Sequence, residues 1–403
     1  MIQDLDDELS NVGINTLVVI GDSTFGNPSL AYVAGATIIR GGIYIKPVGN
    51  DPMLIVGECD VGSAKEGIVK DIRTYSEFGF IELAKQLGIN KAIMEICVRA
   101  LNGLNVKGNI CIAGKVEAGI AVSGVEWLKN KGFSISIDEE LVDRVRMTKD
   151  HIEIDKIRIV GKKTEKVMDA TIKMLLECNF DNEENLKGED GKHFTIGDVK
   201  AFIRMKLAEE NLIASWGTIF AIGAESADPH NVGGEQTVIT TNTPIVFDIF
   251  PQELGGYCFD TTRTFVIGKA SEKVRKNYMD VLESQQLALD VIKSGVPAKE
   301  VMMKVCEFLE AKGYKTPIYY SKKNIPMTEG FTHGLGHGIG LTLGEPPELI
   351  NIFSEDILKE GVVTTVEPGL YYPNEFGVRV EDVVVVRKNK IENLSTLPKE
   401  LEI

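Results

Sequence analysis

Residues 244–268 read PIVFDIFPQELGGYCFDTTRTFVIG, with apolar and aromatic runs on either side of Leu254 and a Gly-Gly pair. Runs of this kind around a glycine-rich turn predict a β-hairpin. Folding the chain about Leu254 places Asp248 opposite Asp260. Directly opposed residues have Cβ atoms about 4.5–5.5 Å apart, and like charges there are destabilising. The hairpin therefore brings two carboxylates together in an otherwise apolar stretch.

A second hairpin is predicted over residues 362–386, VVTTVEPGLYYPNEFGVRVEDVVVV, with its turn at the Pro-Asn pair. Folding the chain about Asn374 places Glu367 opposite Glu381. The second hairpin thus repeats the pattern of the first, with facing carboxylates between apolar strands.

The four carboxylates need compensating charge, because burying an unpaired charge is costly. One source is arginine, since Arg263 and Arg379 lie in the same two hairpins, and another is water at solvated strand ends. Two hairpins with the same arrangement favour a third source, a pair of divalent cations that balances four negative charges.

Residues 331–340, FTHGLGHGIG, carry two histidines four positions apart. A helix would place His333 and His337 on one face, as in zinc-binding helices. However, each of the four glycines would cost a helix about 1 kcal/mol relative to alanine. A phosphate-binding loop is also disfavoured, because the stretch has neither a Gly-Lys-Ser/Thr ending nor dinucleotide-binding spacing.

The remaining interpretation of this stretch is an extended segment, in which alternate side chains face opposite ways. One face then carries His333, Leu335, His337 and Ile339. The glycines of the other face would let a backbone or a ligand approach closely. In a regular strand the two histidines lie roughly 13 Å apart, so they would not bind the same ion. The simpler alternative is two hydrogen-bonded histidines in a glycine-rich turn.

The order of elements predicts two domains, divided near residue 145. Before that point, short apolar strands such as NTLVVIGD (15–22) and DPMLIVGE (51–58) alternate with helical stretches such as IELAKQLG (81–88), as in an α/β domain. After it, apolar residues from Ile154 to Ile172 predict a long amphipathic helix. The polar insert DNEENLKGEDGKH (181–193) is expected to be a surface loop.

Composition excludes several classes of function. The 403 residues carry a net charge of −15 and no basic stripe, which disfavours nucleic acid as a partner. The six cysteines form no CxxC pair, so a cysteine zinc site is not expected. The acidic start, MIQDLDDELS, and the absence of a long apolar run predict a cytoplasmic protein without a membrane partner.

Taken together, these residues resemble the metallopeptidase family with the pita-bread fold, which includes methionine aminopeptidases, aminopeptidase P, Xaa-Pro dipeptidase and creatinase. The resemblance implies a creatinase-like α/β N-terminal domain over residues 1–145 and an α+β pita-bread catalytic domain over residues 146–403. The stretches NPSLAYVAG and RMTKDHIEIDKIR are similar to the creatinase, prolidase and aminopeptidase P branch. The metal ligands that the family order implies are Asp248, Asp260, His337, Glu367 and Glu381.

The same resemblance implies a mechanism with two divalent ions, Mn²⁺, Co²⁺ or Zn²⁺, that activate a hydroxide. Asp260 and Glu381 would bridge the ions, and Glu367 would also carry the proton to the leaving nitrogen. Arg379 would orient the carboxylates by charge-assisted hydrogen bonds. The family's substrate-binding histidine corresponds to His230 in SADPHN, and His333 is a second candidate for this role.

The resemblance also implies a short peptide substrate with proline in second place, and a homodimer. It leaves open whether the enzyme is a dipeptidase or an aminopeptidase. The chain departs from the family pattern at Gly344, where related enzymes carry a second active-site histidine, and in one extra residue between Asp248 and Asp260, which a bulge would absorb. Two alternatives therefore stay open: a non-catalytic module that binds peptides or proteins, and a creatinase-like C–N hydrolase.

Overall fold

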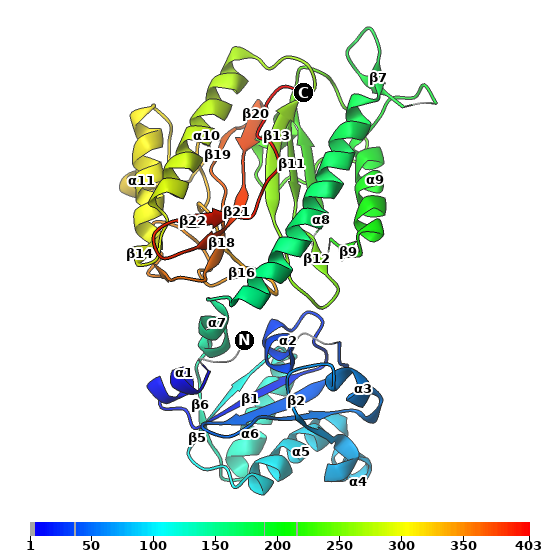
Figure 1. Ribbon diagram of the computed structural model, residues 1–403, viewed down its shortest axis with the longest axis vertical. Coiled ribbons are helices and arrows are strands. Elements are labelled where there is room, and N and C mark those ends of the chain that lie inside the picture. Colours follow the sequence, from blue (N-terminus) through cyan, green and yellow to red (C-terminus); the bar gives the residue numbers. More distant parts are fainter. Residues whose placement is uncertain (1–4, 36–37, 189, 215–216) are drawn as a thin grey trace. The chain divides into compact units, whose positions relative to one another are not determined.

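The computed structural model describes residues 5–35, 38–188, 190–214 and 217–403. The chain divides into two compact units, Met1–Arg146 and Met147–Ile403, so the division lies one residue from the expected position. The first unit is α/β and the second α+β, as the sequence predicts (Figure 1). Among the described helices, none has both the length and the apolar character needed to cross a lipid bilayer.

The first unit is built on a six-stranded sheet with the order β4-β3-β2-β1-β5-β6. Its strands are β1 (Thr16–Gly21), β2 (Gly42–Pro47), β3 (Met53–Val56), β4 (Asp71–Thr74), β5 (Asn109–Ala113) and β6 (Ser134–Ser136). Strand β2 is antiparallel to both of its neighbours, and the other adjacent pairs are parallel. All strands except β2 therefore end at the same edge of the sheet.

Helices lie on both sides of this sheet (Figure 1). They are α1 (Leu5–Asn11), α2 (Pro28–Ala34), η1 (Glu58–Asp60), α3 (Val61–Ala64), η2 (Tyr75–Phe78), α4 (Phe80–Leu87), α5 (Ile89–Gly103), α6 (Ala118–Asn130) and α7 (Leu141–Arg146). An apolar core lies between the sheet and α4, α5 and α6, and it includes Val18, Ile55, Met94 and Leu128.

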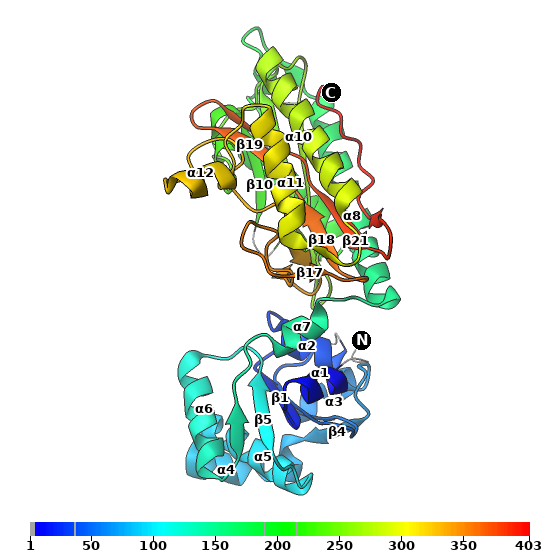
Figure 2. The same cartoon turned by 90° about the vertical axis from the view of Figure 1, so that its left-hand side faces the viewer.

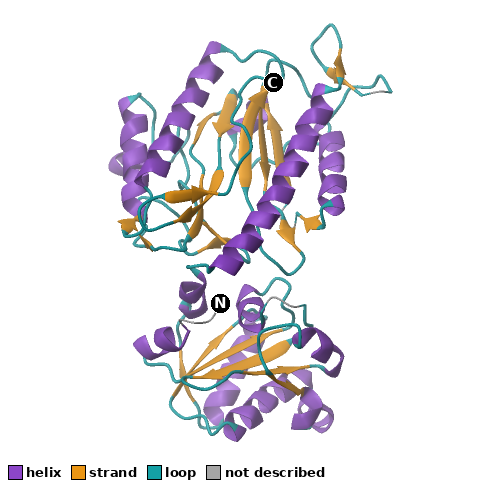
Figure 3. Ribbon diagram, viewed as in Figure 1, coloured by secondary structure: helices purple, strands orange, loops and turns teal. Residues whose placement is uncertain are grey.

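The second unit surrounds curved antiparallel sheets with long helices (Figures 1 and 3). The helices are α8 (His151–Leu176), α9 (Ile196–Glu209), η3 (Gly223–Ala227), α10 (Glu272–Val291), α11 (Ala298–Ala311) and α12 (Pro317–Lys323). Helix α8 is the predicted amphipathic helix, and Asp150 caps its first turn by accepting hydrogen bonds from two backbone N–H groups. Helices α10 and α11 lie side by side (Figure 2).

The strands of this unit fall into several small sheets. They are β7 (Asn179–Phe180), β8 (Leu186–Lys187), β9 (Leu212–Ile213), β10 (Thr218–Ile222), β11 (Pro244–Ile249), β12 (Gln252–Glu253), β13 (Thr261–Val266), β14 (Val296–Pro297), β15 (Gly338–Ile339), β16 (Leu343–Glu345), β17 (Ile357–Leu358), β18 (Val363–Val366), β19 (Gly369–Tyr372), β20 (Phe376–Arg379), β21 (Asp382–Val386) and β22 (Ile391–Asn393). The polar insert, expected to be a plain loop, contains strand β8, which pairs with β7 directly before the insert.

The first predicted hairpin forms, but its register differs by two residues from the predicted one. Strands β11 and β13 pair Asp248 with Thr262 instead of Asp260. The turn is centred on Gly255, which has a φ of +67°, a conformation that glycine adopts without steric cost. The register stays the same from β11 to the turn, so the extra residue lies in the turn and forms no bulge. A shift of two residues keeps each side chain on its own face of the sheet.

The second hairpin has the predicted register. Strands β18 and β21 pair Val366 with Asp382, and β19 and β20 pair Gly369 with Arg379. Glu367 and Glu381 lie opposite each other in the gap between these two ladders. The backbone N–H and C=O groups in this gap are not used in the hairpin's own ladder, so they can form hydrogen bonds with other strands.

The two hairpins lie side by side, because β13 bonds to the second hairpin at this gap. The N–H of Glu381 donates to the carbonyl of Thr262 at 3.1 Å, and the hydroxyl of Thr264 donates to the carbonyl of Arg379 at 2.8 Å. On the other side, the N–H of Glu367 donates to the carbonyl of Leu335 at 2.8 Å. The hairpins and the histidine segment thus form one continuous surface.

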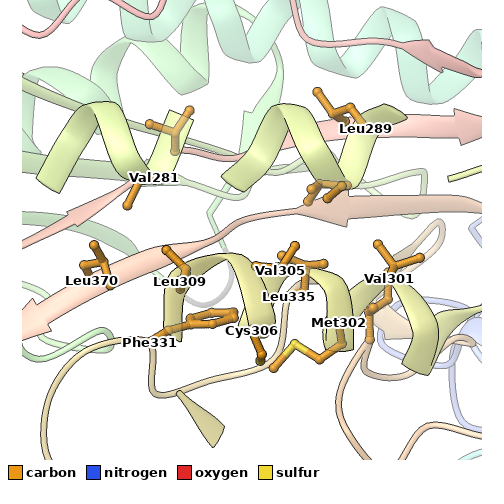
Figure 4. Packing of buried hydrophobic residues seen from close by; sticks show 14 of the residues in the cluster. Val281, Leu289, Val301, Met302, Val305, Cys306, Leu309, Phe331, Leu335 and Leu370 are labelled. Atoms are coloured by element: carbon orange, nitrogen blue, oxygen red, sulfur yellow. The ribbon is translucent and has the colours of Figure 1, made fainter. Parts of the chain in front are cut away.

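The histidine segment is extended rather than helical, but its side chains do not alternate regularly as expected. Leu335 and Phe331 join the apolar core with Leu309 of α11 and Leu370 of β19 (Figure 4), whereas His337 lies among the carboxylates. The reason is that only the end of the segment pairs as a regular strand, β15.

Close backbone approach at the glycines of this segment is confirmed. A Cβ atom on Gly336 would lie 2.1 Å from the carbonyl oxygen of Thr365, and one on Gly338 would lie 2.3 Å from that of Glu345. Both distances are too short for any side chain, so these positions require glycine.

Candidate metal centre

The five residues expected to bind metal come from five neighbouring segments of the second unit. Asp248 lies in β11, Asp260 directly precedes β13, and His337 directly precedes β15. Glu367 and Glu381 lie in the gap of the second hairpin. Four of the five thus lie where a regular ladder stops, so that their positions are set by the strands on either side.

Three of these residues form a group that fits a metal ion. One ligand atom from each of Asp260, His337 and Glu381 lies within 4.8 Å of the other two. Ligands on opposite sides of one ion at about 2.1 Å from each would be about 4.2 Å apart, so small side-chain movements suffice. Within the described residues, no other group of three or more such side chains has this geometry.

His337 presents Nε2 to the carboxylates. This atom lies 3.6 Å from Oδ2 of Asp260 and 3.8 Å from Oε1 of Glu367. Nδ1 lies 3.1 Å from the carbonyl oxygen of Gly338, which can only accept a hydrogen bond, so Nδ1 carries the proton. The lone pair of Nε2 is then available to a metal ion, in the usual arrangement of a ligating histidine.

Two carboxylate oxygens at the centre are buried without a hydrogen bond in the described structure, Oδ1 of Asp248 and Oδ1 of Asp260. Buried carboxylate oxygens normally have partners, because leaving them without one costs the full desolvation energy. Unpaired buried oxygens on two acids of this group therefore suit a cation.

The charge balance points the same way. Burial and mutual repulsion raise the pKa values of Asp260 and Glu381 well above their ordinary range, and burial raises the pKa of Glu367 to about 7. In the described structure, the four carboxylates have one ion pair to a buried guanidinium, that between Asp248 and Arg379, because the charge of Arg263 is paired with Asp382. Divalent cations would remove this excess of negative charge, so the residues fit metal ions.

Arg379 binds one of the carboxylates and not the whole group. Its Nη2 lies 2.6 Å from Oδ2 of Asp248, and its Nε donates to the hydroxyl of Thr262 at 3.2 Å. The hydroxyl of Thr262 in turn donates to Oε2 of Glu381 at 2.8 Å. Direct contact with Glu381, two residues along the same strand, is not made. The other arginine considered, Arg263, binds Asp382 outside the centre.

His333 lies at the edge of the centre with both ring nitrogens engaged. Nδ1 donates to the carbonyl of Gly334 at 2.7 Å, and Nε2 lies 2.9 Å from the hydroxyl of Tyr371, which also accepts from Arg379. Burial and the charge of Arg379 lower the pKa of His333 to about 3, so its ring is neutral at pH 7. A contact between His333 and substrate would have to replace one of these bonds.

The resemblance implied that His230 lies on a strand. The structure places it in the turn after η3 instead. Its side chain is exposed, while the carbonyl of the preceding Pro229 accepts from Arg379 at 3.2 Å.

The sequence prediction missed the roles of Thr262, Thr365 and Tyr371. Thr365 lies 3.4 Å from Glu367, and the other two residues link Arg379 to the acids and to His333. The signal was available in DTTRT and VEPGLYYP, where polar side chains interrupt apolar strands beside the predicted ligands. Which acid each of these side chains contacts depends on the register between strands, which the sequence pattern does not give.

Gly344 lies in β16 with a φ of +72°, is exposed, and has no atom within 4 Å of where its Cβ would be. The next residue, Glu345, is buried in an ion pair with Lys149 at 3.0 Å, and both side chains are 1% exposed. The ion pair of Glu345 therefore holds strand β16 in place, while there is free space where a side chain at position 344 would lie.

Comparison with known proteins places these features in context. The profile of metallopeptidase family M24 matches residues 155–388. The Xaa-Pro dipeptidase of Pyrococcus furiosus is 30% identical over 93% of both chains, and that of Pyrococcus horikoshii is 28% identical over 93% of this chain and 92% of the relative.

Solved structures agree over the whole length. An X-Pro aminopeptidase from Thermotoga maritima superposes with a TM-score of 0.77 at 25% identity, covering 98% of this chain and 100% of that chain. The prolidase of Pyrococcus furiosus gives a TM-score of 0.73 at 27% identity, with 98% and 99% coverage. The N-terminal domain of the FACT complex subunit SPT16 from chickpea shares the fold alone, with a TM-score of 0.71 at 16% identity over 99% of this chain and 95% of that chain.

Proposed function

Because the chain belongs to metallopeptidase family M24, whose members are metal-dependent, we propose that it hydrolyses the peptide bond before proline in Xaa-Pro dipeptides or in peptides that begin Xaa-Pro. The preference for proline is supported by the names of relatives that match over nearly the whole chain. The pita-bread fold and the metallopeptidase class do not depend on this finer assignment.

The observation that carries the proposal is the convergence of four carboxylates and His337 from separate strand segments, with Oδ1 of Asp248 and of Asp260 left unpaired. Two divalent ions, Mn²⁺, Co²⁺ or Zn²⁺, would supply Lewis acidity that makes water nucleophilic at neutral pH. Asp248, Asp260, His337, Glu367 and Glu381 are the residues that would hold these ions.

The remaining residues orient the ligands and move a proton. Arg379 holds Oδ2 of Asp248, so Oδ1 stays directed to the ion. Thr262 fixes Oε2 of Glu381 in the same way. Glu367 is the carboxylate that would accept a proton and pass it to the leaving nitrogen.

The test is hydrolysis of Ala-Pro, Ala-Pro-Ala and Ala-Ala by protein stripped of metal and then supplied with Mn²⁺, Co²⁺ or Zn²⁺. Cleavage of Ala-Pro alone would identify a dipeptidase, and cleavage of the tripeptide at its first bond would identify an aminopeptidase. Equal cleavage of Ala-Ala would contradict the preference for proline. The expected homodimer and cytoplasmic location stay predictions.

A second candidate function is a non-catalytic module that binds a peptide. It is favoured by Gly344, which offers no side chain where related enzymes place a histidine. The retained ligand set opposes it, because a binding module has no need of buried acids that repel one another. Binding of two metal equivalents without hydrolysis of any of the three peptides would support this candidate.

A further inference from the structure

The first unit contains a large cavity of about 710 Å³, within the range of small-molecule sites. It lies at the edge of the sheet where the parallel strands end, with Gly21 at the end of β1, Gly57 after β3 and Gly114 after β5 among its lining residues. A second cavity of about 700 Å³ adjoins it and shares residues such as Met94 and Ile120 of α5 and α6. All residues of both cavities belong to this unit alone.

The position of the larger cavity follows from the order of the strands. From β1 the chain runs outward through β2, β3 and β4, and it then returns to the other side of β1 for β5 and β6. The connections after β1 and β5 therefore leave in opposite directions and open a crevice between them. Open α/β sheets bind ligands in this crevice, outside the carboxyl ends of the strands.

The surface inside the cavity is apolar and incompletely covered. Ile20 and Ile112 lie on interior strands but are only half-buried. Helix α6, which should cover them, buries only Gly124 and Leu128 among its 13 described residues. Farther out, Ile137 is 83% exposed. Apolar side chains at the centre of a sheet are normally covered, so this gap has room for an apolar ligand.

The charged groups around the cavity are mainly acidic. They are Asp22, Glu58, Asp138, Glu139 and one base, Arg40. Arg144 neutralises Asp138 through bonds of 3.0 and 2.6 Å, and Glu58 accepts from the N–H of Ser76 at 3.0 Å. Asp22 and Glu139 are exposed and make no hydrogen bond or ion pair with another residue in the part of the chain that the structure describes. The cavity therefore has the carboxylates of Asp22 and Glu139 at its rim and apolar side chains such as Ile20 and Ile112 inside it.

We propose that this cavity binds a small apolar molecule that carries an ammonium group, with the apolar body against Ile20 and Ile112 and the cation at Asp22 and Glu139. An apolar anion would lose its hydration and meet like charge at this rim, so it is excluded by the same argument. The site is separate from the metal centre and does not depend on the peptidase assignment.

The experiment measures binding of 4-phenylbutylamine, 4-phenylbutanol and 4-phenylbutyrate to the full-length protein by isothermal titration calorimetry. These probes share one apolar body and differ in the charge of the head group. The amine is expected to bind about two- to fivefold more tightly than the alcohol, and the acid more weakly than either.

Two variants locate the site. Ala121→Trp fills the cavity from α6 and should abolish binding of the amine, whereas Val122→Trp, at an exposed neighbour outside the cavity lining, should leave it unchanged. The double variant Asp22→Asn with Glu139→Gln should bring the affinity for the amine down to that for the alcohol. Glu126→Gln, on the same helix and outside the lining, is its control. Peptidase activity should be unchanged in all of these variants.

Three results would overturn the proposal. They are no measurable binding of any probe, tightest binding of the acid, and binding of the amine that Ala121→Trp does not affect, since the amine would then occupy another site. A dimer that Ala121→Trp converts to a monomer would also overturn it, because a second copy of the chain would then be the occupant. Sedimentation of wild type and variant separates this last outcome.

Discussion

Arg379 and Asp248 form a buried ion pair, with 2.6 Å between Nη2 and Oδ2, that leaves Oδ1 of Asp248 without a hydrogen bond. The guanidinium binds one oxygen of the carboxylate, so the other oxygen is available to a ligand. It is also the one direct ion pair between this arginine and the four acids in the described structure. Asp248 would therefore be the acid most affected by loss of Arg379.

Arg379→Met should destabilise the metal-free protein by about 3–5 kcal/mol, because it leaves a buried carboxylate uncompensated. Unfolding in urea measures the difference in free energy. The matched control is Arg73→Met, whose ion pairs with Asp71 and Glu77 are exposed and should contribute little to stability. Equal and small losses in both variants would show that the buried pair has no special energetic role.

Asp260→Asn should abolish metal-dependent hydrolysis and lower the bound metal by at least one equivalent. The change removes the charge of the residue that lies with His337 and Glu381 in the ligand group, while the shape of the side chain is kept. Elemental analysis after dialysis gives the metal content, and hydrolysis of Ala-Pro gives the activity. Asp51→Asn, at an exposed position of the first unit, should change neither quantity. Normal turnover in Asp260→Asn would exclude the two-metal mechanism.

The stability of the metal-free protein should fall as pH rises from about 5 to 8. Burial raises the pKa of Glu367 from 4.5 to about 7. Between these values the folded state holds a proton that the unfolded chain has lost, so the free energy of unfolding decreases with rising pH. For Glu367 alone the loss amounts to about 3 kcal/mol, and the raised pKa values of Asp260 and Glu381 act in the same direction. The lowered pKa of His333 acts in the opposite direction up to its ordinary value of 6.5, but it is one group against three.

Thermal unfolding at pH 5 and pH 8 in EDTA measures this effect, and addition of Mn²⁺ should raise the melting temperature more at pH 8 than at pH 5. The reason is that the ions neutralise charges that exist only above the folded pKa values. A melting temperature that rises with pH in EDTA would contradict the raised pKa values.

Much of the metal centre could be predicted from sequence because hairpins transmit local patterns. The turn at Asn374 fixes which residues of its hairpin face each other. Glu367 and Glu381 are equally far from this turn in the sequence, so their pairing could be predicted. The turn at Gly255 was placed one residue too early, and Asp248 was paired with the wrong partner. Since a shift of two residues keeps a side chain on its face, the error changed the partner and not the surface.

Other features depend on contacts between distant segments that no local pattern encodes. Tyr371 meets His333 only because β19 packs beside the histidine segment, where Gly330 and Tyr371 form a bridge. The cavity of the first unit is likewise absent from the sequence pattern, since Ile112 reads as an ordinary core residue. Whether such a residue is covered depends on how closely a helix packs over its strand.

The buried pair of Lys149 and Glu345 should stabilise the fold only as a pair. Lys149→Met and Glu345→Gln are each expected to cost about 3–5 kcal/mol, because each removes one charge of a buried ion pair. The double variant should cost less than the sum of the single variants by at least about 1 kcal/mol. Urea unfolding of all four proteins completes the cycle, and simple additivity would mean that the two side chains act independently.

Gly344→His should raise kcat/KM for Ala-Pro by tenfold or more, toward the 10²–10³ that one transition-state hydrogen-bond donor typically contributes. The exposed position has no atom within 4 Å of a Cβ, so an imidazole has room. The φ of +72° costs a non-glycine residue about 1–2 kcal/mol, which the unfolding free energy should show. Gly344→Ala carries the same backbone cost without the imidazole and should give no gain in rate. Equal activity of the two variants, with full metal content in both, would mean that a histidine at this position does not limit catalysis in this protein.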